Sequence, residues 1–312
     1  MTGISVSLET TVGRLTLQNP IMVASGTFGY AREMAPVLDL SKLGAIIPKT
    51  VTLKPRDGNK TPRTVETAAG LLNAIGLDND GIDRFLVEKL PDLLTYGPPI
   101  LVSIAAKSPE ECAIFGEKLR GVPGIAAIEL NISCPNVSGG TDYGTDPKLC
   151  ENLVREMCRA TDQMIIVKLT PNVTKIADVA LAAVAGGAEA ISAINTCLGM
   201  AVDWRTRRPR LANGFGGLSG PAIKPIALRC VYQIYQAFQS EKISVPIIGI
   251  GGIATAEDVL EFLVAGASAV QIGTANFYDP TITAKIVGQL SKHLESHDIS
   301  CIKSLIGTLR FL

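Results

Sequence analysis

The segment with the clearest chemical potential is ELNISCPN, residues 129–136. Asn131 and Ser133 alternate at the end of an apolar run, so they share one face of a strand. Cys134 follows directly and begins a glycine-rich loop. A thiol there could remove a proton while a hydride leaves for a flavin, provided that its pKa falls from about 8.5 towards the working pH. The alternative is a small apolar residue at a turn, and Cys197, which also follows a strand end, is a second candidate.

Two lysines stand at the ends of apolar runs, where a charge is costly to bury. Lys49 is the second-to-last residue of AIIPKT (45–50), and Lys168 lies in MIIVKLT (164–170). A buried ammonium needs an anion or a polar partner. We therefore expect both lysines to meet a ligand, either negative charge on a reduced flavin ring or a substrate oxygen. The alternative is a structural ion pair inside the fold.

Three glycine-rich segments indicate a phosphate site. GIGGIA (249–254) and IGT (272–274) each follow an apolar run, and GLSG (217–220) would supply a third glycine loop. Backbone N–H groups can approach an anion at such loops, and a helix N-terminus favours negative charge. GIGGIA also matches the dinucleotide fingerprint, but the next strand ends in Gly273, where an acidic residue would hold a ribose. A mononucleotide phosphate fits better.

The elements that must position these residues are strands buried on both faces. Eight continuous apolar runs predict them: PIMVAS (20–25), AIIPKT (45–50), ILVSIA (100–105), AAIELNIS (126–133), MIIVKLT (164–170), AISAIN (190–195), VPIIGIGG (245–252) and AVQIGT (269–274). Continuous apolar residues are typical of parallel strands covered by helices. Nearly every run ends in a polar residue or glycine, which a β/α barrel would place on one rim. We predict a single-domain α/β protein, a (β/α)8 TIM barrel, with a doubly wound sheet as the alternative.

Amphipathic helical stretches lie between the strands, for example PEECAIFGEKLR, PKLCENLVREMCRA and AEDVLEFLVAG. The last one follows Thr255, whose spacing to Asp258 predicts a capping box, and Gly266 is its predicted C-cap. No linker divides the chain. We therefore expect one domain over residues 1–312, with a short segment of about residues 1–18 before the first barrel strand.

The composition excludes several classes of protein. Lys and Arg number 29 against 29 Asp and Glu, so the formal net charge is zero, whereas a nucleic-acid-binding domain usually has a basic excess. No run of about 20 apolar residues predicts a membrane span, and the first residues do not resemble a secretory signal, so we expect a cytoplasmic protein. Seven cysteines without a CxxC pair predict reduced thiols. We expect no metal site, because only His293 and His297 could join the cysteines.

Several motifs together resemble class 1 dihydroorotate dehydrogenases. They are LNISCPN, NAIGLDN (73–79), INT (194–196), ANGFGGLSGPAIKPIAL (212–228) and the GG…IGT pair. The resemblance runs from about Asn19 to Phe277. The pattern NVxGGxxxGTDP after Cys134 is more similar to the NAD-linked class 1B branch than to the fumarate-using class 1A branch. The resemblance implies an FMN-binding barrel that oxidises (S)-dihydroorotate to orotate in de novo pyrimidine biosynthesis.

The resemblance also implies roles for individual residues. Cys134 would take the proton from C5 of dihydroorotate, while the C6 hydride passes to N5 of FMN. The substrate-binding residues would be Lys49, Asn73, Ala74, Ile75, Gly76, Leu77, Asn131, Asn136, Asn195 and Thr196. The residues that hold FMN would be Ser25, Lys49, Thr50, Ser103, Asn131, Lys168, Ile194, Gly220, Gly251, Gly252, Gly273 and Thr274. Ser103 departs from the family, which usually has asparagine there, although serine could donate a hydrogen bond directly or through water.

The electrons that the flavin takes up must pass to an acceptor, and the chain itself has no cysteine cluster for an iron–sulfur centre. The class 1B resemblance implies a partner subunit that carries FAD and a 2Fe-2S cluster and passes electrons to NAD. It also implies a homodimer of this chain with one partner on each protomer, a heterotetramer. A class 1A enzyme would need only the homodimer, with fumarate as oxidant.

Other flavin barrels and a non-catalytic role are the remaining alternatives. A tRNA-dihydrouridine synthase would bring a basic surface and an RNA-binding domain, which the balanced charge argues against. The flavin domain of dihydropyrimidine dehydrogenase belongs to a far longer chain. A flavin carrier without activity would bind FMN and ignore every dihydropyrimidine, and Cys134, Lys49 and Asn131 argue against it. The basic run WRTRRPR (204–210) is expected to be a solvated loop.

Overall fold

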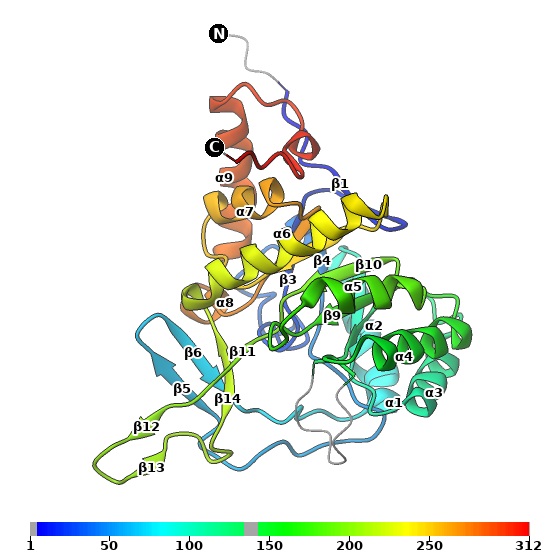
Figure 1. Ribbon diagram of the computed structural model, residues 1–312, viewed down its shortest axis with the longest axis vertical. Coiled ribbons are helices and arrows are strands. Elements are labelled where there is room, and N and C mark those ends of the chain that lie inside the picture. Colours follow the sequence, from blue (N-terminus) through cyan, green and yellow to red (C-terminus); the bar gives the residue numbers. More distant parts are fainter. Residues whose placement is uncertain (1–4, 134–142, 312) are drawn as a thin grey trace.

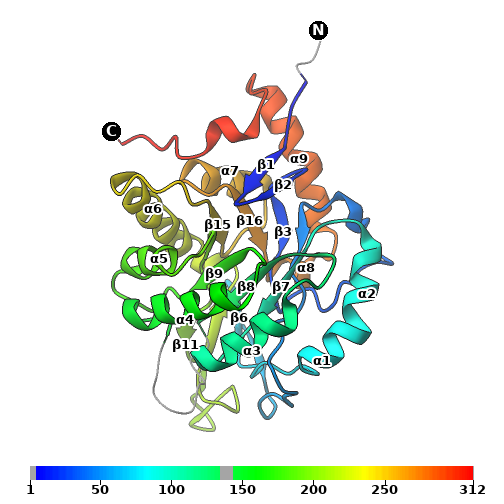
Figure 2. The ribbon, with the colours of Figure 1, turned by 90° about the vertical axis from the view of Figure 1, so that its right-hand side faces the viewer.

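Eight parallel strands close into a barrel in the computed structural model, which describes residues 5–133 and 143–311 (Figure 1; Figure 2). The barrel strands are β3 (Ile21–Val23), β4 (Ala45–Ile46), β7 (Ile100–Ile104), β8 (Ile125–Asn131), β9 (Ile165–Leu169), β10 (Ala190–Ala193), β15 (Ile247–Ile250) and β16 (Ala269–Ile272). They pair in chain order, and β16 pairs with β3 to close the barrel. Each predicted run overlaps one strand. The barrel prediction is confirmed, and the doubly wound alternative is wrong.

Helices form the outer layer. The longer ones are α3 (Pro109–Leu119), α4 (Pro147–Ala160), α5 (Ile176–Ala185), α6 (Lys224–Ser240), α7 (Ala256–Val264) and α9 (Ile282–Ser296), and the shorter ones are α1 (Ile82–Arg84), α2 (Leu90–Leu93) and α8 (Ala275–Tyr278). A π-helical turn (Phe85–Lys89) joins α1 to α2, and 3-10 turns occur at Leu40–Lys42, Leu94–Tyr96, Pro221–Ile223 and Ile302–Leu305. Covering the barrel with helices buries its strands on both faces, which explains their continuous apolar sequence.

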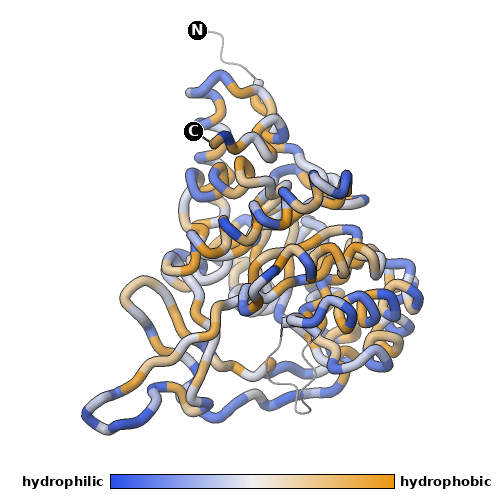
Figure 3. Tube along the Cα trace, in the orientation of Figure 1, coloured by the Kyte–Doolittle hydropathy of each residue, from blue (hydrophilic) through white to orange (hydrophobic). Residues whose placement is uncertain are grey.

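Hydropathy follows this layering. In Figure 3 apolar segments gather at the barrel strands and on the helices that surround them, while polar segments lie at the periphery. Among the residues that the structure describes, no helix is both long enough and apolar enough to cross a membrane.

Helix α7 shows how local sequence sets an element that borders the barrel rim. The Thr255 hydroxyl accepts a hydrogen bond from the N–H of Asp258 (3.1 Å), and the Asp258 carboxylate accepts one from the N–H of Thr255 (2.8 Å). The predicted capping box is therefore confirmed. At the other end Ala265 is the C-cap, and Gly266 follows it with φ 118°. The C-cap prediction is wrong by one residue, although glycine is needed there because a Cβ would lie 2.3 Å from the ring of Tyr235.

The lumen of the barrel is closed at its N-terminal end. The hairpin of β1 (Thr10–Val12) and β2 (Leu15–Leu17) precedes the first barrel strand. Buried apolar side chains fill this end, namely Val12 and Leu17 from the hairpin and Met22, Ile47, Leu101, Ala127, Met164, Ile166, Ala190, Ile248 and Ala269 from the strands and their flanks. This end of the lumen is an apolar plug, which leaves the opposite, polar end for a site.

A second sheet lies beyond the C-terminal ends of the barrel strands. Its antiparallel strands are, in order, β11 (Cys197–Gly199), β14 (Gly216–Ser219), β6 (Gly70–Asn73) and β5 (Thr64–Thr67). The hairpin of β12 (Val202–Asp203) and β13 (Arg208–Pro209) projects from it (Figure 1). The prediction of a glycine loop at 217–220 is wrong for its first three residues, which belong to β14, and only Gly220 leaves the strand. The basic run 204–210 is exposed in the projecting hairpin, as expected for a solvated loop.

Candidate active site

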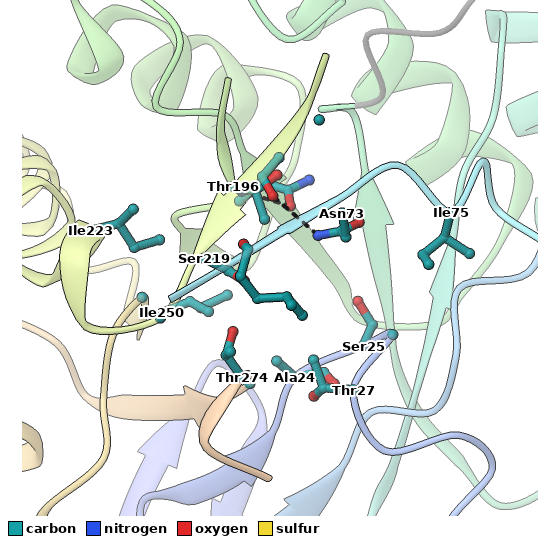
Figure 4. A pocket seen from close by; sticks show the side chains of 18 of the residues that line it. Ala24, Ser25, Thr27, Asn73, Ile75, Thr196, Ser219, Ile223, Ile250 and Thr274 are labelled. Atoms are coloured by element: carbon teal, nitrogen blue, oxygen red, sulfur yellow. Dashed lines mark hydrogen bonds between the residues drawn. The ribbon is translucent and has the colours of Figure 1, made fainter. Parts of the chain in front are cut away.

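A cavity of about 650 Å³ lies between the C-terminal strand ends and the antiparallel sheet. This volume falls in the range of roughly 300–1,000 Å³ that is typical of small-molecule and cofactor sites. The predicted site residues that line it are Ser25, Lys49, Thr50, Asn73, Ala74, Ile75, Gly76, Leu77, Asn131, Lys168, Ile194, Asn195, Thr196, Gly220, Gly251, Gly252, Gly273 and Thr274. Figure 4 shows Ser25, Asn73 and Thr274 from three different elements around one central space. The fold thus brings together residues that lie far apart in the sequence.

Ser103 is a predicted flavin contact that the structure does not bring to the cavity wall. Its side chain is fully buried, and its hydroxyl lies 2.9 Å from the Thr50 hydroxyl. Thr50 does line the cavity. Ser103 therefore supports a wall residue from behind.

Glycines form one part of the cavity wall. Gly220 (φ 93°) and Gly252 (φ 73°) both have a left-handed backbone. A Cβ on Gly252 would lie 2.9 Å from the carbonyl oxygen of Gly220, and one on Gly220 would lie 2.8 Å from the Cα of Gly70. The loops that follow β14 and β15 therefore approach too closely to admit side chains. Within the described part of the chain, no hydrogen bond uses the backbone N–H of Gly252 or Thr274, so both donors can bind an anion.

Amide side chains line another part of the wall. Asn195 Nδ2 donates to Asn131 Oδ1 over 3.3 Å, and the same oxygen accepts a hydrogen bond from the N–H of Ser133 (3.1 Å). Asn73 Nδ2 donates to the carbonyl oxygen of Gly217 (3.3 Å; Figure 4). The oxygen of Asn131 is thus used within the protein, whereas its Nδ2 has no hydrogen-bond acceptor among the described residues. A ligand with a carbonyl oxygen would complete this arrangement.

The segment 73–77 is held in place by residues that the sequence did not single out. The backbone carbonyl of Arg63 accepts a hydrogen bond from the N–H of Ala74 (2.7 Å), and Asn59 Nδ2 donates to the carbonyl of Ala74 (2.9 Å). Arg63 Nη1 also donates to Asp78 Oδ2 (2.8 Å). These contacts connect the cavity wall to the preceding loop. No motif marked them, because their partners lie 11 to 15 residues away in an irregular segment.

Lys49 lies on the wall with its ammonium uncommitted. Burial lowers its pKa below the usual 10.5, while Asp78 raises it and Arg63 lowers it further. The Lys49 ammonium has no hydrogen bond or ion pair within the described residues. An anionic ligand would offset the cost of burying this charge.

Lys168 has the ion pair that was the alternative expected for its position. Its ammonium lies 3.4 Å from Glu129 Oε1, 3.4 Å from Gln271 Oε1 and 3.4 Å from Ser25 Oγ. It therefore forms an ion pair inside the barrel and also lines the cavity. Glu129 and Gln271 are fully buried and were not among the predicted site residues. The signal that could have found them is a carboxylate and an amide inside otherwise apolar barrel strands.

Comparison with known proteins identifies the family. Residues 7–294 match the family model for dihydroorotate dehydrogenase. This chain belongs to the dihydroorotate dehydrogenase family. It is 52% identical to the protein of Geotalea uraniireducens named dihydroorotate dehydrogenase B (NAD(+)), catalytic subunit, over 97% of this chain and 98% of that protein. Proteins of the same name from Geobacter sulfurreducens and Desulforudis audaxviator are 50% and 48% identical, each over 97% of this chain and over 98% and 97% of their own length.

These matches confirm the resemblance seen in the sequence, and the names of the relatives agree with its NAD-linked branch. Two predicted site residues of this dihydroorotate dehydrogenase family member, Cys134 and Asn136, lie outside the described residues. The rival thiol, Cys197, is partly buried in β11 and does not line the cavity. Burial raises the pKa of Cys197, which leaves less of the thiolate that a base requires. Cys134 therefore remains the predicted base.

Proposed function

We propose that this chain oxidises (S)-dihydroorotate to orotate in de novo pyrimidine biosynthesis, with FMN as hydride acceptor and Cys134 as base. The observation that carries the proposal is one cavity in which free backbone N–H groups at glycine loops share a wall with Lys49 and several amides. A phosphate and an anionic amide ring would each find matching partners in that space. Family membership supports the same assignment.

The residues on the glycine side fit a flavin mononucleotide. The N–H groups of Gly252 and Thr274 are available for a phosphate, and the close approach of Gly220 to Gly252 leaves no room for a side chain at either position. Lys168 and Ser25 line the cavity as well and would contact the ring. When bound, FMN would supply a two-electron acceptor that takes the C6 hydride of the substrate at N5.

The amides and Lys49 would bind and orient the substrate. Lys49 supplies a positive charge for the carboxylate of dihydroorotate, which is one reason for an uncommitted ammonium on the wall. The free Nδ2 of Asn131 can donate to a ring carbonyl, with Asn195 fixing the Asn131 side chain. The antiparallel sheet, from which Asn73 reaches the cavity, covers this side and would limit the access of water to a bound substrate.

Proton removal is assigned to Cys134. It lies three residues after Asn131, whose side chain reaches the cavity, so a short connection leads from the wall to the thiol. As a thiolate it would take the proton from C5, which leaves orotate with a new C5–C6 double bond once the C6 hydride has gone. Asn136, two residues further along the sequence, would add a substrate contact.

We further infer that the electrons leave through a second subunit that carries FAD and a 2Fe-2S cluster and reduces NAD. The printed name of the relatives, catalytic subunit, supports a separate partner. Leu198, Trp204 and Phe215 are exposed on the projecting sheet and hairpin and offer apolar surface for subunit contacts. We expect a homodimer of the single domain 1–312 with one partner per protomer, a cytoplasmic heterotetramer, which light scattering of the co-expressed complex would measure.

An anaerobic visible spectrum of the purified chain, before and after L-dihydroorotate is added, tests the proposed half-reaction. We expect a flavin band that bleaches on addition. Cys134→Ala should keep the flavin band and bind orotate but bleach far more slowly. A bound flavin that stays oxidised in the unaltered chain would refute the substrate assignment.

The fumarate-using branch is the alternative to NAD, and the names of the relatives do not favour it. After reduction by dihydroorotate, the isolated chain should be reoxidised slowly by fumarate. The complex with its partner should be reoxidised by NAD⁺. Rapid reoxidation of the isolated chain by fumarate would contradict the NAD-linked assignment.

A further inference from the structure

A charged cluster lies buried inside the barrel, one layer below the cavity. Glu129 is fully buried, and its carboxylate contacts side chains from three other strands. Lys168 Nζ lies 3.4 Å from Oε1, while Gln271 Nε2 and Ser192 Oγ lie 2.5 Å and 3.2 Å from Oε2. The proposed proton and hydride transfers make no use of Glu129. Burying a carboxylate costs desolvation free energy, so its presence beneath a cavity indicates a functional role.

The groups around Glu129 match a carboxylate. Lys168 Nζ, Gln271 Nε2 and Ser192 Oγ each carry a hydrogen that they can donate to it. The amide of Gln271 connects the two charges, because its Nε2 donates to Glu129 and its Oε1 accepts from Lys168. The cluster therefore contains a carboxylate, an ammonium and two neutral groups that satisfy them.

Lys168 is held between this carboxylate and the cavity. Its contacts to Glu129, Gln271 and Ser25 are all 3.4 Å, longer than the roughly 2.9 Å of an ordinary N–H···O hydrogen bond. These long contacts leave the ammonium at the wall of the cavity that it lines, where its charge acts on a ligand. The charge that a ligand meets there is the positive charge of Lys168, reduced by the negative charge of Glu129 behind it.

We propose that Glu129 is a positioning residue that lowers the reduction potential of the bound flavin by acting through Lys168. This rests on the proposed function, which places FMN beside Lys168. An uncompensated ammonium would stabilise the negative charge of reduced flavin and raise the potential. Glu129 offsets part of that charge in surroundings of low dielectric, where the effect is strong. The flavin is then kept able to give electrons to a low-potential acceptor such as NAD.

Glu129→Gln tests the proposal, because it removes the charge and keeps the size of the side chain. The reduction potential of the flavin-loaded chain would be measured anaerobically against a reference dye. At a fixed potential we expect the ratio of reduced to oxidised flavin to rise at least tenfold, which is about 30 mV for a two-electron couple. An unchanged potential with the flavin still bound would overturn the proposal.

A double-mutant cycle tests whether Glu129 acts through Lys168. In a Lys168→Gln background, Glu129→Gln should change the ratio less than threefold, because the ammonium through which the carboxylate acts is gone. An equal change in both backgrounds would contradict action through Lys168. Glu129→Asp keeps the charge and should restore the ratio to within threefold. A purely structural role would instead lower the unfolding temperature and leave the potential unmoved.

Ser192→Ala provides the test should Glu129→Gln fail to fold. It removes one donor to the carboxylate without changing any formal charge. The negative charge of Glu129 is then less neutralised, so the ratio should move about threefold in the opposite direction, towards oxidised flavin, or about 14 mV. An unchanged ratio in this variant would refute the proposal.

The potential is set with a chemical reductant, so the measurement requires FMN but no dihydroorotate. Flavin that binds but is not reduced by dihydroorotate refutes the proposed function and leaves the test of Glu129 intact. A potential that ignores Glu129 in a chain that dihydroorotate does reduce refutes only the inference. A chain that binds no flavin refutes both.

Discussion

The two ends of the barrel lumen are built from the same strands but from different chemistry. The N-terminal end is filled by apolar side chains such as Met22, Ile166 and Ile248, all of them fully buried. The next layer holds Glu129, which is fully buried, and Lys168, which is buried except where it lines the cavity, and both are charged. Burial therefore does not distinguish the two ends. The distinction is whether the buried groups satisfy one another by packing or by hydrogen bonds.

The change from one chemistry to the other takes two residues along a strand, the spacing at which side chains return to the same face. The inward-facing series are Ala127, Glu129 and Asn131 on β8, Ile166 and Lys168 on β9, and Ala269 and Gln271 on β16. Each series runs from apolar to polar towards the C-terminal end. The same strands therefore supply a stabilising apolar core at their N-terminal ends and a site at their C-terminal ends. Substitutions at the two ends should have separable effects on stability and on activity.

The largest effect is expected from Cys134→Ala, which removes the proposed base. Loss of a general base typically slows proton transfer about 10²- to 10⁴-fold, so flavin reduction by dihydroorotate should slow by that factor. Anaerobic stopped-flow spectroscopy would measure the rate. The unfolding temperature should not change, and Cys197→Ala is a matched control that should keep the rate. A Cys134→Ala variant with the normal rate would remove this thiol from the mechanism.

A substitution in the apolar N-terminal end of the lumen should lower stability and leave the flavin chemistry unchanged, and Ile166→Ala tests this. Truncation of a fully buried isoleucine leaves a cavity and should lower the free energy of unfolding by about 2–5 kcal/mol. Denaturant titration would measure the loss, and Ile166→Val should cost only about 0.5–1.5 kcal/mol. The flavin potential should stay unchanged, because Ile166 lies one layer below the charged cluster. A shifted potential would show that the two ends are not separable.

The barrel could be predicted because each of its strands carries its own signal. A strand buried on both faces must be continuously apolar, whatever its neighbours are. The antiparallel sheet carried no such signal, since strands of three or four residues, one of them GGLS, are indistinguishable from loops. Its pairing of β14 with β6 also joins segments more than 140 residues apart. Only the fold reveals that contact.

The site was predictable to the extent that its residues stand at strand ends. Parallel strands bring those ends to one rim, so Lys49, Asn131 and Thr274 could be grouped before their distances were known. Glu129 was missed because its role depends on partners from other strands. Ser103 was predicted from the family resemblance, which assigns a position and does not show that Thr50 lies between this serine and the cavity.

A smaller effect on the site at the C-terminal strand ends is expected from Lys49→Met. Loss of a hydrogen bond to a charged group costs about 1.5–3 kcal/mol, so the affinity for orotate should fall roughly 10- to 100-fold. Fluorescence or spectral titration of the flavin-loaded chain would measure it. The unfolding free energy near neutral pH should not fall, because Lys49 makes no ion pair with the described residues. Undiminished orotate affinity would exclude Lys49 from the substrate site.

The pH dependence of Lys49 adds a second readout. Burial lowers its pKa below 10.5, so the ammonium loses its proton at a lower pH in the folded protein than in the unfolded one. Orotate affinity should therefore fall as the pH rises through this lowered pKa. The ligand-free protein should gain stability over the same interval, because the unfolded state binds more protons there. Lys49→Met should lack both changes, and the difference between the two proteins isolates the lysine from the titration of orotate.

The smallest effect is expected at the rim, outside both layers, from Thr255→Ala. Loss of the N-cap oxygen that accepts from Asp258 should cost about 1 kcal/mol of unfolding free energy. Thr255→Ser keeps this acceptor and should restore stability. Asp258 would still accept from the N–H of Ala254 and pair with Lys224, so the glycine loop before α7 should keep its shape and FMN its affinity. A marked loss of FMN affinity in Thr255→Ala alone would show that stability and cofactor binding are coupled through this cap, and that the separation along the lumen does not extend to the rim.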